Sequence, residues 1–85
     1  MYILLIKDNC ERCDWVKKHI PDGLNIRFID AKSVDGMSYL AYYEKYDEKT
    51  TFPVFITGEE AIEGTIEIRK KMQEIKENKL EIKNG

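Results

Sequence analysis

The hydrophobic pattern begins with residues 2–6, "YILLI", where five apolar side chains follow one another without a polar break. An uninterrupted apolar run of this length is typical of a strand that is covered on both faces, as in a parallel or mixed sheet. The polar residues 7–10 that follow predict a turn. We therefore expect the chain to begin with a buried strand that leads into a polar loop.

Apolar side chains spaced three and four residues apart then predict a first helix, which runs from residue 10 or 11 to Ile20. Cys13, Val16 and Ile20 fall on one stripe of this helix, which is the pattern of a helix with one buried face. Pro21 cannot continue a helix and is expected to end it. In residues 25–31 apolar and polar positions alternate instead of following a helical spacing, and this alternation predicts a second strand.

Residues 36–48 predict a second helix, and Asp35 can cap its N-terminus. The buried face of this helix is predicted to hold Met37, Leu40, Ala41 and Glu44. The segment also contains four tyrosines, Tyr39, Tyr42, Tyr43 and Tyr46. We expect these rings to pack partly against the sheet and to expose their hydroxyls, rather than to form a dedicated binding surface.

A hairpin is predicted over residues 53–63, with Gly58 in its turn. Pro53 begins the first strand of this hairpin, where its missing N–H donor does not interrupt a ladder. A last helix is predicted from Thr65, which can cap it, to about Asn78. Its apolar stripe consists of Ile68, Met72 and Ile75. The tail "LEIKNG" alternates weakly, and we interpret it as a short strand or a frayed end.

The order of elements is therefore β-α-β-α-β-β-α in one domain, residues 1–85. A strand–helix–strand unit places its two strands parallel to each other, and the later hairpin adds antiparallel strands. The sequence thus predicts an α/β fold with a four-stranded mixed sheet flanked by three helices.

Composition narrows the class of protein further. The net charge of −2 gives no basic surface of the kind that nucleic-acid-binding proteins use. No apolar run approaches the roughly 20 residues that span a bilayer, and "MYILLI" lacks the basic region and cleavage site of a signal peptide. Two cysteines are too few for the disulfide framework of a secreted domain. We expect a cytoplasmic monomer that binds neither nucleic acid nor membrane.

Both cysteines lie in "DNCERCDW", separated by two residues, at the start of the first predicted helix. Free N–H groups and the helix dipole favour an anion at that end, and the thiolate of Cys10 is such an anion. Cys13 lies one turn further on, on the buried stripe. This asymmetry predicts that Cys10 attacks a substrate disulfide and that Cys13 then attacks Cys10 to release the reduced substrate.

Pro53 is the second part of the predicted site. In this topology the loop before the third strand lies beside the N-terminus of the first helix. A cis peptide bond between Phe52 and Pro53 is therefore predicted, because cis bonds occur mainly before proline and mark specific tight turns. Backbone groups exposed near Cys10 would allow an extended substrate to pair with them as an added strand.

With these motifs together, the sequence resembles the glutaredoxin-like branch of the thioredoxin superfamily over nearly the whole chain. The resemblance rests on the strand and turn before "CERC", on "TFPVFITG", and on "EG" before the last helix. It implies a thioredoxin fold and an enzyme, a thiol–disulfide oxidoreductase without a bound cofactor that reduces protein disulfides. In that family the first cysteine is the nucleophile, the second resolves, and the cis-proline loop contacts the substrate. These roles carry over to Cys10, Cys13 and Pro53.

The resemblance also assigns substrate contacts around the pair. Thr51 and Phe52 occupy the positions whose backbone holds glutathione or peptide in relatives. Lys7 matches a lysine that glutaredoxins often use to meet a glutathione carboxylate. Glu11 and Arg12 replace the Pro-Tyr that glutaredoxins usually carry between their cysteines, and we expect them to influence the reduction potential and the choice of partner.

The segment before the last helix departs from the glutaredoxin pattern. Glutaredoxins usually have paired glycines and then acidic residues that recognise the γ-glutamyl end of glutathione. Residues 63–67, "EGTIE", keep one glycine, and Ile66 cannot replace an acid. Gly64 and Thr65 of this segment are predicted substrate contacts. The spacing from Pro53 to Gly58 and Gly64 is more similar to that of small glutaredoxin-like redoxins that donate electrons to ribonucleotide reductase. Those are usually reduced by thioredoxin reductase, which we expect here as the electron source, with glutathione as the alternative.

Two other classes of function compete with this interpretation. The cysteine pair supplies two of the roughly four ligands of a structural zinc site, and two chains could share a metal or an iron–sulfur cluster. His19 is the other soft ligand, but its spacing places it on a different face of the helix. The second alternative is a binding module without catalysis, for which Trp15 beside the motif is a candidate recognition residue.

Overall fold

The computed structural model describes the backbone of residues 1–84 and the side chains of residues 1–78. Seven elements follow one another in the predicted order: β1 (Tyr2–Ile6), α1 (Glu11–Lys18), β2 (Ile26–Asp30), α2 (Val34–Tyr42), β3 (Val54–Ile56), β4 (Ala61–Glu63) and α3 (Thr65–Asn84). Within the part that the structure describes, no helix has the length and apolar character needed to cross a membrane.

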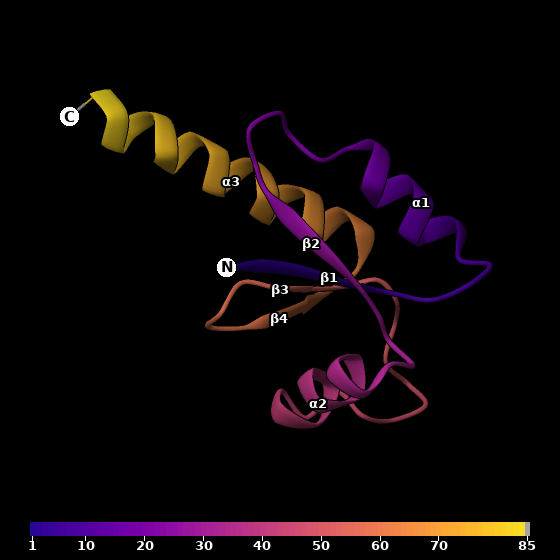
Figure 1. Cartoon of the computed structure of the whole chain (residues 1–85). Helices are drawn as coiled ribbons and strands as arrows, with labels where there is room; N and C mark the ends of the chain where they lie inside the picture. The colour runs from indigo at the N-terminus through magenta and orange to yellow at the C-terminus, as the bar shows by residue number, and fades with distance from the viewer. Residues whose placement is uncertain (85) are drawn as a thin grey trace.

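The four strands form one mixed sheet in the order β2-β1-β3-β4. β1 pairs in parallel with β2 and antiparallel with β3, so that Leu4 lies between Phe28 and Phe55. β3 and β4 form the predicted antiparallel hairpin. Helices α1 and α3 lie on one side of the sheet and α2 lies on the other (Figure 1). The predicted α/β architecture is therefore confirmed at the level of elements and strand directions.

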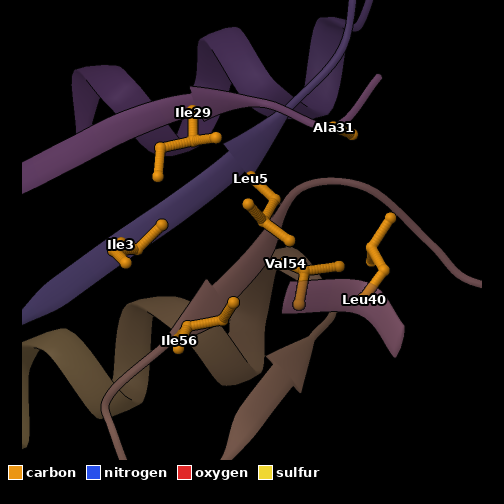
Figure 2. Close-up of a cluster of buried hydrophobic side chains, with 7 residues drawn as sticks. All are labelled: Ile3, Leu5, Ile29, Ala31, Leu40, Val54 and Ile56. Atoms are coloured by element: carbon orange, nitrogen blue, oxygen red, sulfur yellow. The ribbon is translucent and has the colours of Figure 1, made fainter. Parts of the chain in front are cut away.

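Each face of the sheet has its own hydrophobic core. Figure 2 shows the core on the α2 side, where Leu40 of α2 meets side chains from β1, β2 and β3. This cluster consists of Ile3, Leu5, Ile29, Ala31, Leu40, Val54 and Ile56. The core under α1 and α3 consists of Leu4, Val16, Leu24, Phe55, Ile68, Met72 and Ile75. Alternate residues of β1 thus enter opposite cores, which explains the unbroken apolar run at the start of the chain.

The first two helices are shorter than predicted. α1 ends at Lys18, where the N–H of His19 turns back to the carbonyl of Val16, so Ile20 lies beyond the helix. α2 ends at Tyr42 instead of residue 48. Glu44 adopts the left-handed region with φ 58°, a conformation that an α-helix of L-residues cannot continue.

The cap and the buried face of α2 also differ from the prediction. Ser33, not Asp35, is the N-cap, because its Oγ accepts the N–H of Gly36 at 3.0 Å. The buried side of the helix consists of Gly36 and Leu40, whereas Met37 is 41% exposed. Ala41 and Glu44 are exposed as well.

The predicted packing of the tyrosines against the sheet is confirmed for two of the four rings. Tyr39 and Tyr43 pack against the core on the α2 side, while Tyr42 and Tyr46 are exposed. Tyr39, Tyr42 and Tyr43 also line an open pocket of about 510 Å³ together with Asp35 and Ser38. The aromatic residues of α2 are therefore divided between packing and surface.

α3 is longer than predicted and begins differently. It continues to Asn84, so the strand interpretation of the tail is wrong, and Gly85 lies outside the described residues. Between Asn78 and Gly85 the chain contains no glycine or proline, and its lysines, leucine and glutamate are strong helix formers. Thr65 is the first residue of the helix rather than its cap, because the carbonyl of Gly64 accepts the N–H of Ile68. Ile68, Met72 and Ile75 are buried as predicted.

The approach of α2 to the sheet gives a prediction about stability. A Cβ on Gly36 would lie 2.2 Å from the backbone oxygen of Asp30. Helix propensity alone favours Gly36→Ala by about 1 kcal/mol, but overpacking typically costs about 1–3 kcal/mol, and a backbone atom cannot move aside as a side chain does. We expect Gly36→Ala to lower the free energy of unfolding by at least about 1 kcal/mol in urea titrations.

Ser38→Ala is the matched control, since it changes an exposed position of the same helix. Its effect should stay within about 0.5 kcal/mol. A Gly36→Ala variant as stable as the parent would show that the helix does not depend on this close approach.

Candidate active site

Cys10 is the N-cap of α1. Its backbone is extended, with φ −116° and ψ 102°, and its Sγ accepts the N–H of Cys13 at 3.1 Å. Asn9 precedes it with φ 52°, a left-handed conformation that asparagine adopts more readily than most residues. A capping side chain satisfies one of the free N–H groups at a helix start. The local backbone therefore places the sulfur of Cys10 where a negative charge is stabilised.

The two cysteines form a disulfide with a Cα–Cα distance of 5.2 Å, which lies within the usual range of such bonds. Their burial differs in the predicted sense. Cys13 is only 2% exposed, whereas Cys10 is half-buried. A substrate can therefore reach the sulfur of Cys10 more easily than that of Cys13.

The Phe52–Pro53 segment lies beside the pair. Its peptide bond is cis, as the sequence predicts, and Pro53 is fully buried. The carbonyl oxygen of Phe52 is 3.9 Å from Cys10 Sγ. The Nζ of Lys7 lies 5.3 Å from the centroid of the Phe52 ring, within the range of a cation–π contact. Five of the predicted site residues, Lys7, Cys10, Cys13, Phe52 and Pro53, are thus brought together from two distant segments.

Glu63 also takes part in this site, although the sequence analysis did not select it. Its Oε1 accepts the N–H of Thr51 at 2.6 Å, and its Oε2 forms an ion pair of 2.8 Å with Lys45 Nζ. The hydrogen bond with Lys45, followed by that with the Thr51 N–H, lowers the pKa of Glu63 below its ordinary value of 4.5. Glu63 lies opposite Val54 in the hairpin, and no local pattern in the sequence indicates its contacts with Lys45 and Thr51.

The remaining predicted contacts have less defined roles. Glu11 and Arg12 are exposed in the first turn of α1. Gly64, with φ 91°, makes the turn from β4 into α3, and Thr65 follows it. Among the hydrogen bonds of residues 1–78, none joins Gly64 or Thr65 to the cysteine pair. Thr51 donates its N–H to Glu63, so Phe52 is the residue of the predicted pair whose backbone faces Cys10.

The metal alternative requires more ligands than the cysteine pair supplies. Among the described residues, no group of three or more histidine, cysteine, aspartate or glutamate side chains is placed to hold an ion. His19 instead stacks on Trp15 at 3.9 Å, and its Nδ1 lies 2.7 Å from the carbonyl oxygen of Trp15. Trp15 is half-buried against the core under α1 and α3, and the Arg69 guanidinium lies 5.9 Å from its ring.

Comparison of the chain with models of protein families, with curated proteins and with solved structures finds no match.

The lowered pKa of Glu63 gives a prediction about pH. Because the folded-state pKa lies below the unfolded value, the stabilisation is complete above about pH 4.5 and is lost as the pH falls through the folded-state pKa. We expect Glu63→Gln to lower the free energy of unfolding at pH 7 by roughly 1–2 kcal/mol, as hydrogen bonds to charged groups do. The difference between the two proteins should shrink on acidification to pH 3.

Urea titrations at both pH values test this, with Glu59→Gln as a control on the exposed β3–β4 turn. An effect of Glu63→Gln that is the same at pH 7 and pH 3 would contradict the assigned charge-assisted bonds.

Proposed function

We propose that this protein is a thiol–disulfide oxidoreductase, a glutaredoxin-like member of the thioredoxin superfamily that reduces disulfides in other proteins. One observation carries the proposal. The first sulfur of a C-x-x-C pair caps a helix N-terminus and lies 3.9 Å from the carbonyl oxygen that precedes a buried proline. The strand order β2-β1-β3-β4, with helices on both faces, is compatible with a thioredoxin fold.

The proposed reaction starts from the dithiol. The thiolate of Cys10 attacks one sulfur of the substrate disulfide, which forms a mixed disulfide and releases the other substrate sulfur as a thiolate. Cys13 loses its proton and attacks Cys10 Sγ, which restores the Cys10–Cys13 disulfide and releases the second substrate thiolate. The substrate gains two electrons, and the two thiolates take up protons. The disulfide seen in the structure is the oxidised end of this cycle.

Local contacts support the different roles of the two cysteines, attack by Cys10 and resolution by Cys13. The N–H of Cys13 points at Cys10 Sγ and would stabilise negative charge on that sulfur when it attacks the substrate disulfide. The burial of Cys13 protects the resolving thiol from direct reaction with other disulfides. The backbone of Phe52, beside Cys10, is the proposed pairing edge for an extended substrate.

We further propose thioredoxin reductase as the electron source, rather than glutathione, and a monomer in the cytoplasm, where thiols are kept reduced. The structure supports the first point through Ile66, which is 65% exposed in the first turn of α3. An exposed apolar side chain offers no partner to the charged γ-glutamyl end of glutathione.

Cysteine variants test the reaction. Cys10→Ser should reduce a peptide disulfide no faster than buffer, because the attacking sulfur is missing. Cys13→Ser should retain the first step and accumulate a mixed disulfide with Cys10, which intact-mass spectrometry detects as an adduct of the substrate half. If Cys10→Ser reduces the peptide disulfide at the rate of the parent protein, the proposed enzymatic activity is wrong.

Reduction of the oxidised protein by each electron source tests the donor. We expect a thioredoxin reductase system to restore free thiols at least about tenfold faster than glutathione at equal reducing capacity. Ile66→Asp should raise the rate with glutathione, because it adds the missing charge, whereas Ile66→Ala should not. Faster reduction of the parent protein by glutathione would contradict this choice of donor.

A further inference from the structure

The segment between α2 and β3 is long and irregular, yet it carries the carbonyl that faces Cys10. Its hydrogen bonds are mostly local: Thr50 N–H donates to the carbonyl of Asp47, Asp47 N–H donates to that of Lys45, and the hydroxyl of Thr50 also donates to the Lys45 carbonyl. In the described part of the chain, the bond from the Thr51 N–H to Glu63 is the hydrogen bond that ties residues 47–52 to the sheet. This bond therefore adds a hydrogen-bonded tie to the packing of Phe52 against the core and to the burial of Pro53 that follows it.

Glu63 uses its two carboxylate oxygens for different partners. One oxygen accepts from Thr51, at the end of the loop, and the other pairs with Lys45, at its beginning. The side chains of Lys45 and Glu63 are 31% and 26% exposed, so salt screens this pair less than a pair on the open surface. Glu63 itself is fixed by β4, where it lies opposite Val54. The carboxylate thus connects both ends of the loop to the β3–β4 hairpin.

We propose that Glu63 is a positioning residue for disulfide exchange: by holding Lys45 and Thr51, it keeps the backbone of Phe52 at the distance from Cys10 that a bound peptide substrate requires. This inference rests on the proposed function. The physical reason is that Phe52 follows Thr51 directly, so a loop released at Thr51 moves the Phe52 carbonyl as well. Misplacement of reacting groups by about 1 Å can cost on the order of 100-fold in rate.

A merely structural role predicts a different behaviour. If Glu63 only stabilised the hairpin, its removal would affect every disulfide substrate equally. A positioning role predicts a selective loss, because a peptide must pair with the Phe52 backbone, whereas a small aromatic disulfide needs only the sulfur of Cys10.

The experiment compares Glu63→Ala, Glu63→Gln and the control Glu60→Ala. Glu60 belongs to the same hairpin and pairs with Lys71 at 3.4 Å, but it has no bond to the loop. The first measurement is amide hydrogen exchange by NMR, which requires no turnover. Glu63→Ala should raise exchange at Thr51 at least tenfold relative to amides of β1, and Glu60→Ala should leave it unchanged.

The second measurement is kcat/KM for a peptide disulfide and for a small aromatic disulfide. Glu63→Ala should lower kcat/KM for the peptide about 10- to 100-fold, mainly through KM. It should leave kcat/KM for the small disulfide within about twofold of the value of the parent protein. Glu63→Gln retains an oxygen that can accept from Thr51, so it should recover most of the peptide activity.

Three results would overturn the inference, and they differ from one another. Unchanged exchange at Thr51 in Glu63→Ala would show that Glu63 does not hold the loop. Raised exchange with equal losses for both disulfides would reduce Glu63 to a structural role and leave the proposed function intact. A parent protein inactive on both disulfides would refute the proposed function itself, whatever the exchange data show about the loop.

Discussion

The antiparallel pairing of β1 with β3 is the constraint on which the site depends. Leu5, near the end of β1, lies opposite Val54, at the start of β3. The chain that leaves β1 towards Cys10 and the chain that arrives at β3 through Pro53 therefore meet at one end of the two central strands, although they are far apart in the sequence. Leu5 and Val54 are fully buried, and each such side chain contributes about 1.5–3 kcal/mol when it leaves water. Core packing thus fixes the register that brings the cysteine pair to the proline loop.

The parts of the structure that the sequence could predict are those that one element's own pattern of residues determines. The apolar run of β1 and the stripe of Ile68, Met72 and Ile75 both predict burial correctly. The run is unbroken because both faces of β1 are covered, and the stripe has the spacing of one helix face. Cys10 at the helix start and Cys13 on its buried side follow from the same spacing. The order of elements and the strand directions were predictable for this reason, and so was the asymmetry of the pair.

The features that were missed depend on contacts between distant segments or on single backbone conformations. The end of α2 depends on the left-handed Glu44, and its buried face depends on the fit of Gly36 against the end of β2. Neither the left-handed conformation of Glu44 nor the close fit of Gly36 can be recognised from the hydrophobic pattern of the sequence. Glu63 was missed because its partners, Lys45 and Thr51, belong to a different segment of the chain, and an acidic residue in a strand usually indicates an exposed position. Long-range bonds between a side chain and the backbone have no local signature.

In the proposed reaction, chemistry and recognition fall to different groups of this site. The groups that would stabilise negative charge on the reacting sulfur belong to the backbone: the N–H of Cys13 and the start of α1. Backbone groups stay in place when neighbouring side chains change. The exposed side chains around them, Glu11 and Arg12, take part in none of these contacts. In the proposed reaction, their charges would act on the choice of partner, because electrostatic complementarity acts mainly on encounter and specificity. They would also act on the reduction potential, as expected from their place between the two cysteines, while the backbone around Cys10 holds the reacting sulfur.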